Sequence, residues 1–446
     1  MAEEKEIMQA ILQGRYGEAF RLLTETAPAS RTAREHYLLH YCYLSGLGTK
    51  PDFEKAKGEL VRAAAQDDPL ALTDAYCSFE ERYLIAGNEE EFLGLVEGPL
   101  EEERAAGNPL ALRALALLTE EGIGRPRSAE KAEALYREAA EAGLAPAAFD
   151  AAAMYGRPEY KNEEKLFFWL EKGAAAGHVQ SMVTAGKLCL RGEGTEKDER
   201  KAASYFRQAA ENGADSVLLL LGVLEKEHPE WKTAPEKTFA ALEKGLALYP
   251  ADGEAGRACL ALGDCFREGF GTERDPEKAL KWYKKGEEKG QSLGGVLAAK
   301  LWYDGDFGPG KEKRAFSQMK RSAKDGDARA MYFLGRFLAE GIGTAADGKQ
   351  AEEWFRRASN RSGVLPYSRL GREAEKQGLL HEFTALIKER AGKDGSLRGA
   401  EPEFPKGKLG STLSVEEAQT GWTEKPPAGL TGLRKKSVGR NSTEAV

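Results

Sequence analysis

Apolar positions recur at three- and four-residue intervals along most of the chain, and closely spaced glycines interrupt them. In one clear segment Ala258 is followed four positions later by Leu262 and Gly263, so these residues share one face of a helix. Gly269 and Gly271 then end the apolar pattern, since glycine accepts the left-handed conformation found just past a helix C-terminus. The pattern therefore predicts two helices joined by a glycine turn.

The same phrase returns many times. It contains a small residue, a Gly-x-Gly, an Asp or Ser, a Lys-Ala, an aromatic pair and a closing small residue. The clearest copies cover 111–143, 181–213, 258–290 and 330–358, with an earlier, shorter copy around 46–56. The Lys-Ala slot falls at positions 18, 55, about 95, 131, 165, 201, 237, 278, 314 and 350. This spacing is typical of helical repeat proteins and predicts about ten units, of which those at 165, 237 and 314 are degenerate.

Each part of the phrase has a physical role. The polar slot after the turn holds side chains that cap a helix start, and we expect them to do so here: Asp52, Ser128, Asp198, Asp275 and Asp347. Alanine and glycine allow helices to approach closely, and the aromatic pair buries a large area. Trp169, Trp282 and Trp354 recur at equivalent positions, which indicates packing between repeats and not a stacking platform for a ligand.

Composition narrows the function. The chain has 446 residues and a net charge of -7, so a dominant nucleic-acid partner is not expected. The start MAEEKEIMQA lacks the features of a signal peptide, and no run approaches about 20 apolar residues, so no integral membrane segment is expected. The five cysteines do not form a disulfide pattern and favour a reducing compartment: Cys42, Cys77, Cys189, Cys259 and Cys265. We therefore expect a cytoplasmic protein.

The phrase A-x-x-x-L-G, G-x-G, D-x-x-K-A, W/Y-F/Y, A-A, G resembles the Sel-1-like repeat, a relative of the tetratricopeptide repeat, over roughly residues 1–392. The resemblance implies an all-α fold, a right-handed α-solenoid superhelix of helix-turn-helix repeats with a concave groove. We expect an N-terminal capping helix pair at 1–36, the repeat array at 37–366 and C-terminal capping helices at 367–392. Residues 393–446 are rich in Gly, Pro, Ser and charge, which predicts a disordered tail.

Three candidate sites have simpler explanations. Segment 305–312 resembles a phosphate-binding loop, but Glu312 stands where the motif needs Ser or Thr, and no strand is expected before it. His36 and His40 lie one helical turn apart, a zinc-compatible spacing, but His40 occupies the glycine slot of a repeat and favours a packing role. Cys259 and Cys265 face different ways on one helix and are expected to be buried thiols. No catalytic, cofactor-binding or metal-binding residue is predicted.

Members of the resembled family are mostly adaptors, and they share no catalytic residues. The leading hypothesis is thus a non-enzymatic scaffold that binds protein or peptide partners on the superhelical groove. One alternative is a hydrolase of the cysteine-rich, β-lactamase-like type, although this chain lacks the paired cysteines of those proteins. A second alternative is an assembly factor for cell-envelope polysaccharide, which would need a route out of the cytoplasm.

Overall fold

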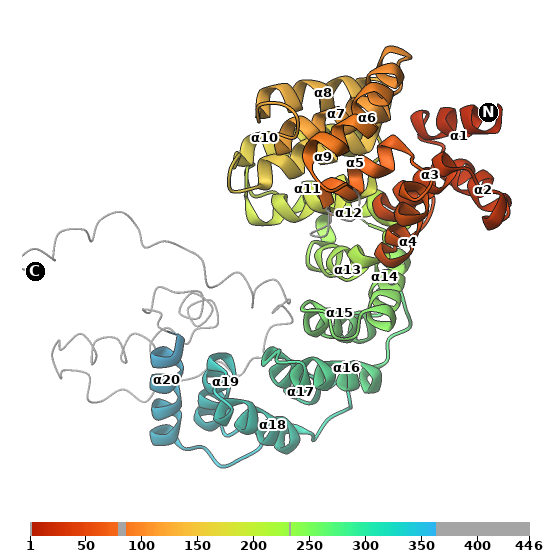
Figure 1. Cartoon of the computed structure of the whole chain (residues 1–446). Helices are drawn as coiled ribbons and strands as arrows, with labels where there is room; N and C mark the ends of the chain where they lie inside the picture. Colours follow the sequence, from red (N-terminus) through yellow and green to blue (C-terminus); the bar gives the residue numbers. More distant parts are fainter. Residues whose placement is uncertain (1, 79–85, 232, 363–446) are drawn as a thin grey trace, which may run out of the picture. The chain divides into compact units, whose positions relative to one another are not determined.

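The computed structural model describes residues 2–78, 86–231 and 233–362, and these residues form helices without any strand. In the described residues twenty α-helices follow one another as ten successive pairs (Figure 1). The helices are α1 (Ala2–Leu12), α2 (Tyr16–Glu25), α3 (Ala33–Ser45), α4 (Phe53–Ala64), α5 (Pro69–Ser78), α6 (Glu89–Ala105), α7 (Pro109–Glu121), α8 (Ala129–Glu141), α9 (Ala145–Gly156), α10 (Glu163–Ala175), α11 (Val179–Arg191), α12 (Glu199–Glu211), α13 (Leu218–Glu227), α14 (Pro235–Leu248), α15 (Ala255–Glu268), α16 (Pro276–Glu288), α17 (Leu293–Tyr303), α18 (Glu312–Lys324), α19 (Ala328–Glu340) and α20 (Gly348–Ser362).

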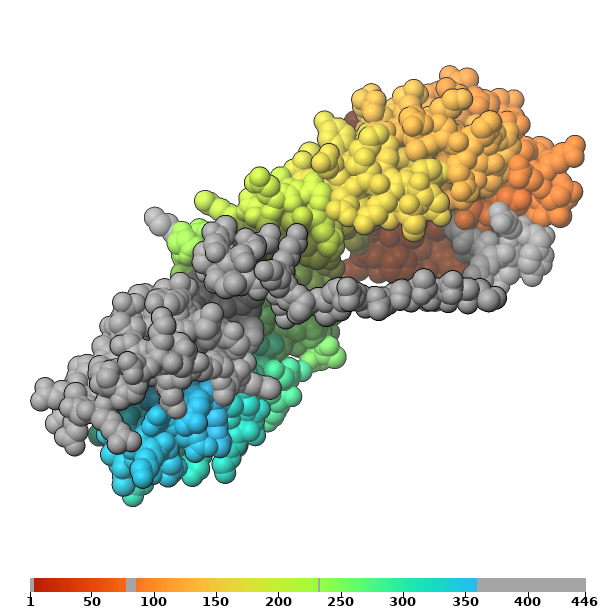
Figure 2. Space-filling model, turned by 90° about the vertical axis from the view of Figure 1, so that its left-hand side faces the viewer, coloured from red at the N-terminus to blue at the C-terminus, as the bar shows by residue number. Residues whose placement is uncertain are grey.

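The chain divides into two compact units. The first contains residues up to Glu225 together with Ala240–Glu254, and the second contains Lys226–Phe239 and the chain from Ala255 onward. Helices α13 and α14 are each divided between the units. Within the first unit, the pairs from α6 to α12 form a continuous surface with no gap between repeats, coloured orange to yellow-green in Figure 2. Each unit is therefore built by stacking one helix pair on the next, and the prediction of an all-α repeat array is confirmed.

The helix ends follow the repeat phrase. All five predicted capping side chains accept a hydrogen bond from the backbone N–H three residues later; for Asp198 this donor is Lys201, at 2.8 Å. Asn88 and Asn162 cap α6 and α10 in the same way. The first glycine of the turn adopts the left-handed conformation, as at Gly122, whose N–H bonds to the carbonyl of Leu118. These caps fix where each helix begins and ends.

The second glycine of the turn touches the preceding helix pair. A Cβ atom added to Gly194 would overlap the carbonyl oxygen of Glu163, the first residue of α10. The same overlap would occur at Gly48, Gly271 and Gly343, each against the first residue of a preceding second helix. This glycine is therefore required because two backbones meet, and not only because the turn needs its conformation.

In three pairs a glycine in the first helix lies against the second aromatic of the second helix: Gly186 on Phe206, Gly263 on Tyr283 and Gly335 on Phe355. Gly263 packs so closely on Tyr283 that any side chain would enter the ring. Tyr283 is fully buried, and Trp169 is also in the core. Trp282 and Trp354 pack against the core of the second unit but remain partly exposed. The predicted packing role thus holds fully for Trp169, whereas Trp282 and Trp354 pack with one part of the ring and expose the rest.

One predicted boundary can be compared with the helices, and two cannot. The expected division between residues 36 and 37 falls inside α3, which begins at Ala33. Helix α6 has 17 residues, more than the other second helices, and its cap Asn88 accepts from the N–H of Glu91. Because the other caps bind the residue in the Lys-Ala slot, this slot lies at Glu91 and not near residue 95 as predicted. The predicted capping helices at 367–392 and the tail at 393–446 lie outside the described residues. The handedness of the superhelix stays a prediction.

We predict that Gly194→Ala destabilises the protein more than Gly213→Ala does. Both glycines have a left-handed backbone, with φ of +67° and +89°, so each alanine costs about 1–2 kcal/mol for that conformation. Only at Gly194 would the new methyl also overlap a backbone carbonyl, which adds about 1–3 kcal/mol. Urea unfolding of the two variants measures the difference, and equal losses would show that the contact between pairs is not needed.

Candidate interaction surface

The first and second helices of a pair differ in how much surface they expose. In α7, ten of thirteen residues are buried, whereas in its partner α8 only Ala132, Glu133, Tyr136 and Ala139 are buried. Most exposed side chains of this repeat therefore come from its second helix. A partner that approaches the folded repeat would meet mainly these positions.

A row of polar side chains crosses four successive first helices of the first unit. The hydroxyl of Tyr37 donates to Asp74 at 3.0 Å, and Nη1 of Arg113 donates to both carboxylate oxygens of Asp74 at 2.8 and 2.9 Å. Nε of Arg113 also donates to Asp150 at 2.7 Å. Arg113 is 7% exposed and Asp74 is 3% exposed. The row therefore links α3, α5, α7 and α9 through one buried guanidinium.

The charges in this row shift one another's titration. Burial opposes the charge on Arg113, but the neighbouring Asp150 and Asp74 raise its pKa well above the usual value. Burial raises the pKa of Tyr37, and the nearby Asp74 raises it further, so the phenol keeps its proton. Burial also raises the pKa of Asp150, and Arg113 opposes that effect. Arg113 is thus the cation that stabilises the buried carboxylate of Asp74 and the partly exposed carboxylate of Asp150.

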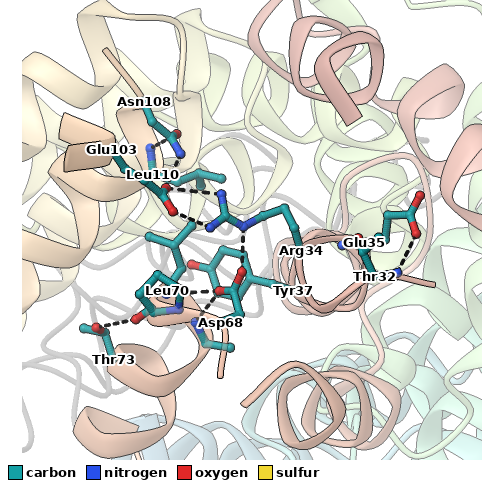
Figure 3. A network of polar contacts seen from close by, with 12 residues as sticks. Thr32, Arg34, Glu35, Tyr37, Asp68, Leu70, Thr73, Glu103, Asn108 and Leu110 are labelled. Carbon is teal, nitrogen blue, oxygen red and sulfur yellow. Dashed lines mark hydrogen bonds and ion pairs between the residues drawn. The ribbon is translucent and has the colours of Figure 1, made fainter. Parts of the chain in front are cut away.

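A second network joins helix ends in the same unit (Figure 3). Arg34 donates through Nε to Asp68 at 2.7 Å and through Nη2 to Glu103 at 2.6 Å. Asp68 in turn accepts from the backbone N–H groups of Leu70 and Ala71 at the start of α5. Glu103 also accepts from Asn108, which caps α7. The arrangement ties α3 to the starts of α5 and α7 and serves the fold, since its charged groups already have partners.

Sequence reasoning missed both networks, although a signal exists. Tyr37, Asp74, Arg113 and Asp150 each lie five or six residues after the residue that precedes a first helix. They interrupt otherwise apolar faces at spacings of 37, 39 and 37 residues. Polar residues that recur at the repeat period inside apolar faces indicate a buried polar row, because successive repeats place them side by side.

The histidine pair has local partners. Nδ1 of His36 lies 2.5 Å from a carboxylate oxygen of Glu59, and Nδ1 of His40 lies 2.9 Å from the carbonyl oxygen of Ala56. Both rings are buried, and burial lowers the pKa of His40. His40 fills the position at which Gly186, Gly263 and Gly335 of other repeats lie under an aromatic ring. The two histidines are thus held as packing residues.

The other sequence candidates are also local features. Segment 305–312 is the turn between α17 and α18, with positive φ at Gly305, Gly308 and Gly310. All five cysteines are free thiols, and Cys42, Cys189, Cys259 and Cys265 are buried. Burial raises the pKa of the Cys42 thiol to about 12, which keeps it protonated at neutral pH. Within residues 2–78, 86–231 and 233–362, no group of three or more His, Cys, Asp or Glu side chains is arranged to hold a metal ion.

Charge is unevenly distributed over the exposed second helices. Helix α6 contains seven glutamates and one arginine, whereas α18 contains five lysines and arginines and one glutamate. Large apolar side chains are exposed singly, for example Phe53 at 69% and Phe168 at 47%. None of the described helices is both long enough and apolar enough to cross a bilayer. The features that distinguish one part of the exposed surface from another are therefore electrostatic.

Replacing Arg113 with methionine should destabilise the first unit by about 3–5 kcal/mol, because Asp74 would keep a buried charge without its cation. The control Arg137→Met removes an arginine whose side chain is 52% exposed and should cost less than about 1 kcal/mol. Adding Asp74→Asn to Arg113→Met should recover part of the loss. Denaturant unfolding measures all three variants, and equal losses for Arg113→Met and Arg137→Met would contradict the role assigned to Arg113.

His178 should make the protein sensitive to acid. It is 1% exposed, and burial lowers its pKa to about 3. Below about pH 6.5 the imidazole of His178 binds a proton in the unfolded chain but not in the folded chain. The free energy of unfolding therefore falls as the pH drops toward 3. Between pH 7 and pH 5 this costs about 2 kcal/mol. His178 precedes α11 at the position where Asn108 precedes α7, so the test is His178→Asn. Thermal unfolding across this pH range should show a smaller loss for the variant, and an unchanged pH dependence would refute the assignment.

The model of the Sel1 repeat matches this chain six times, at residues 36–68, 109–144, 145–178, 180–213, 256–291 and 328–362. The matches include the five copies that the sequence phrase identified. They also include 145–178, predicted as degenerate, which forms the regular pair α9 and α10. The pairs α5–α6, α13–α14 and α17–α18 lie between the matched segments.

Two curated relatives are regulatory proteins of Schizosaccharomyces pombe. Chitin synthase regulatory factor 3 is 27% identical over 276 residues, which is 60% of this chain and 26% of that protein. Chitin synthase regulatory factor 1 is 31% identical over 126 residues, which is 27% of each protein. The chain thus matches only about a quarter of the length of these relatives.

Among solved structures, similarity extends to a protective antigen of uropathogenic Escherichia coli strains that displays an SLR fold. It has 20% identity and a TM-score of 0.44, and the match covers 88% of each chain. A Sel1 repeat protein from Oxalobacter formigenes has 25% identity and a TM-score of 0.25, covering 66% of this chain and 96% of the other. The assignment depends on the six matched segments and on the helix pairs that coincide with them. This chain is a Sel1 repeat protein.

Proposed function

We propose that this protein is a non-enzymatic scaffold that binds protein partners through the exposed faces of its repeats. The observation that carries the proposal is the division of roles within each pair. The shared residues of the repeat are used for turns, caps and core, while the exposed positions of the second helices vary in charge from the acidic α6 to the basic α18. Repeat arrays with a constant interior and varied exteriors suit the binding of several proteins.

Partners would bind the exposed second helices and not the concave groove that the sequence led us to expect. First helices such as α7 are buried on nearly every side, so their side chains are occupied by contacts within the array. Second helices have exposed side chains that recur at the spacing of the repeat. We place the scaffold in the cytoplasm, where its five free thiols would stay reduced.

The test is affinity purification of the full chain from its own cells under native conditions, with quantitative mass spectrometry. The test variant neutralises three exposed charges of α6 (Glu90→Gln, Glu97→Gln and Glu101→Gln) and leaves the buried residues unchanged. A reproducible partner set that changes with the exposed charges at unchanged melting temperature is expected. The proposal fails if the wild-type chain retains no partner that an unrelated helical protein does not also retain. It also fails if the purified chain turns over a substrate.

A second candidate is suggested by the names of the two fission-yeast relatives. A scaffold of this kind could serve as a regulator of a polysaccharide synthase, with the synthase itself or a delivery factor as a partner. In the same purification, enrichment of a glycosyltransferase would support this role. Deletion of the protein should then change synthase activity in membranes but not synthase abundance. Unaltered activity in the deletion strain would remove this candidate.

A further inference from the structure

The second unit carries a cationic feature that the repeat fold does not require. Each of its last three second helices carries two adjacent cationic residues: Lys284–Lys285, Lys320–Arg321 and Arg356–Arg357. The pairs are 36 residues apart in both intervals, so they occupy equivalent repeat positions on α16, α18 and α20. Equivalent positions in α8, α10 and α12 hold Arg137–Glu138, Glu171–Lys172 and Arg207–Gln208. We call the six residues of the second unit the cation ladder.

The ladder is exposed and partly preorganised. All six side chains are on the solvent face of their helices. The ammonium of Lys285 lies 4.6 Å from the ring centre of Trp282, and the guanidinium of Arg357 lies 4.7 Å from that of Trp354. Arg321 reaches from α18 to Glu287 of α16 at 2.7 Å, which shows that these two helices are neighbours. The partly buried indoles thus hold cations in place by cation–π contact.

The first member of each pair has a different setting. Lys284 and Arg356 have no ion pair within the described part of the chain, and Lys320 lies 5.8 Å from the ring centre of Phe316. These three cations are available to an approaching anion. Figure 1 shows α16, α18 and α20 following one another along the second unit, and the three cations occupy equivalent positions on these helices.

We propose that the cation ladder binds an acidic segment of a partner protein, with carboxylates spaced to meet successive helices. This inference rests on the proposed scaffold function and names its docking surface. One arginine side chain spans the distance between two consecutive ladder helices, since Arg321 of α18 bonds to Glu287 of α16, and an extended chain advances about 3.3 Å per residue. A glutamate or aspartate at every third residue would therefore meet one cation pair after another, and arginine can bind a carboxylate through two parallel hydrogen bonds.

A protein segment fits better than a nucleic acid or an anionic membrane. Exposed Glu277, Glu288 and Glu353 lie on the same helices as the ladder, and they would face the charges of a continuous polyanion. A segment with spaced carboxylates can place neutral or basic residues opposite these glutamates. The large apolar side chains exposed in the described residues all precede residue 250, so this face offers none for insertion into a bilayer. The net charge of -7 also opposes binding to an extended anionic surface.

The test is fluorescence anisotropy of the full chain with two labelled peptides of one composition. One has glutamate at every third position, and the other has the same glutamates in a single block. The ladder variant is Lys284→Glu, Lys320→Glu and Arg356→Glu. The matched control, Lys131→Glu, Lys187→Glu and Arg200→Glu, makes the same change in net charge at exposed positions of the first unit. Melting temperatures of all proteins should agree.

The wild type and the control should bind the spaced peptide at least tenfold more tightly than the ladder variant does, with an affinity that falls as salt rises. The blocked peptide should bind more weakly than the spaced one. Equal loss in the control would overturn the proposal, because binding would then follow net charge alone. Tighter, ladder-dependent binding of duplex DNA or of phosphatidylserine vesicles would overturn the choice of partner class.

The native purification separates this inference from the scaffold function. If the ladder variant keeps every partner of the wild type, the scaffold function stands and the ladder proposal fails. If the wild type has no partners in cells yet binds the spaced peptide through the ladder, the scaffold function fails and the ladder remains a site for acidic segments.

Discussion

Four helix pairs of the array meet the preceding pair at a glycine, and at this point two backbones come into contact. The glycine at the end of the turn lies on the carbonyl of the first residue of the previous second helix, as Gly271 lies on Pro235. No other residue allows this approach, because even a methyl group would overlap the carbonyl oxygen. The distance between pairs is thereby set by backbone geometry and not by the size of side chains.

The fold could be predicted because its determinants are local in sequence. The turn glycines, the capping Asp198 and the buried Tyr283 are each within a few residues of the feature they define. The repeat then multiplies the signal, so one noisy copy matters little. The pair α9–α10 was judged degenerate because its turn lacks Gly-x-Gly, yet Asn162 still caps α10 and Trp169 still packs in the core. Caps and core residues were sufficient there without the glycine turn.

Features that depend on several repeats could not be predicted in this way. Arg113 bonds to side chains 39 residues before it and 37 residues after it, and neither partner carries a mark of that role in its own repeat. The partial exposure of Trp282 depends on its position at the edge of α16. Such properties arise from lateral neighbours, which a single repeat does not reveal.

Buried charge and exposed charge have opposite consequences in this chain. Arg113 cannot be changed freely, because the buried carboxylate of Asp74 depends on its charge. The cations of α16, α18 and α20 lie outside the turns, caps and buried core of their repeats, so the fold places little constraint on their sign. Equivalent positions in the first unit hold glutamate, glutamine or single cations, and those helices pack in the same way. A row of three adjacent cation pairs is therefore not a by-product of the repeat, and a binding role is the physical reason that accounts for it.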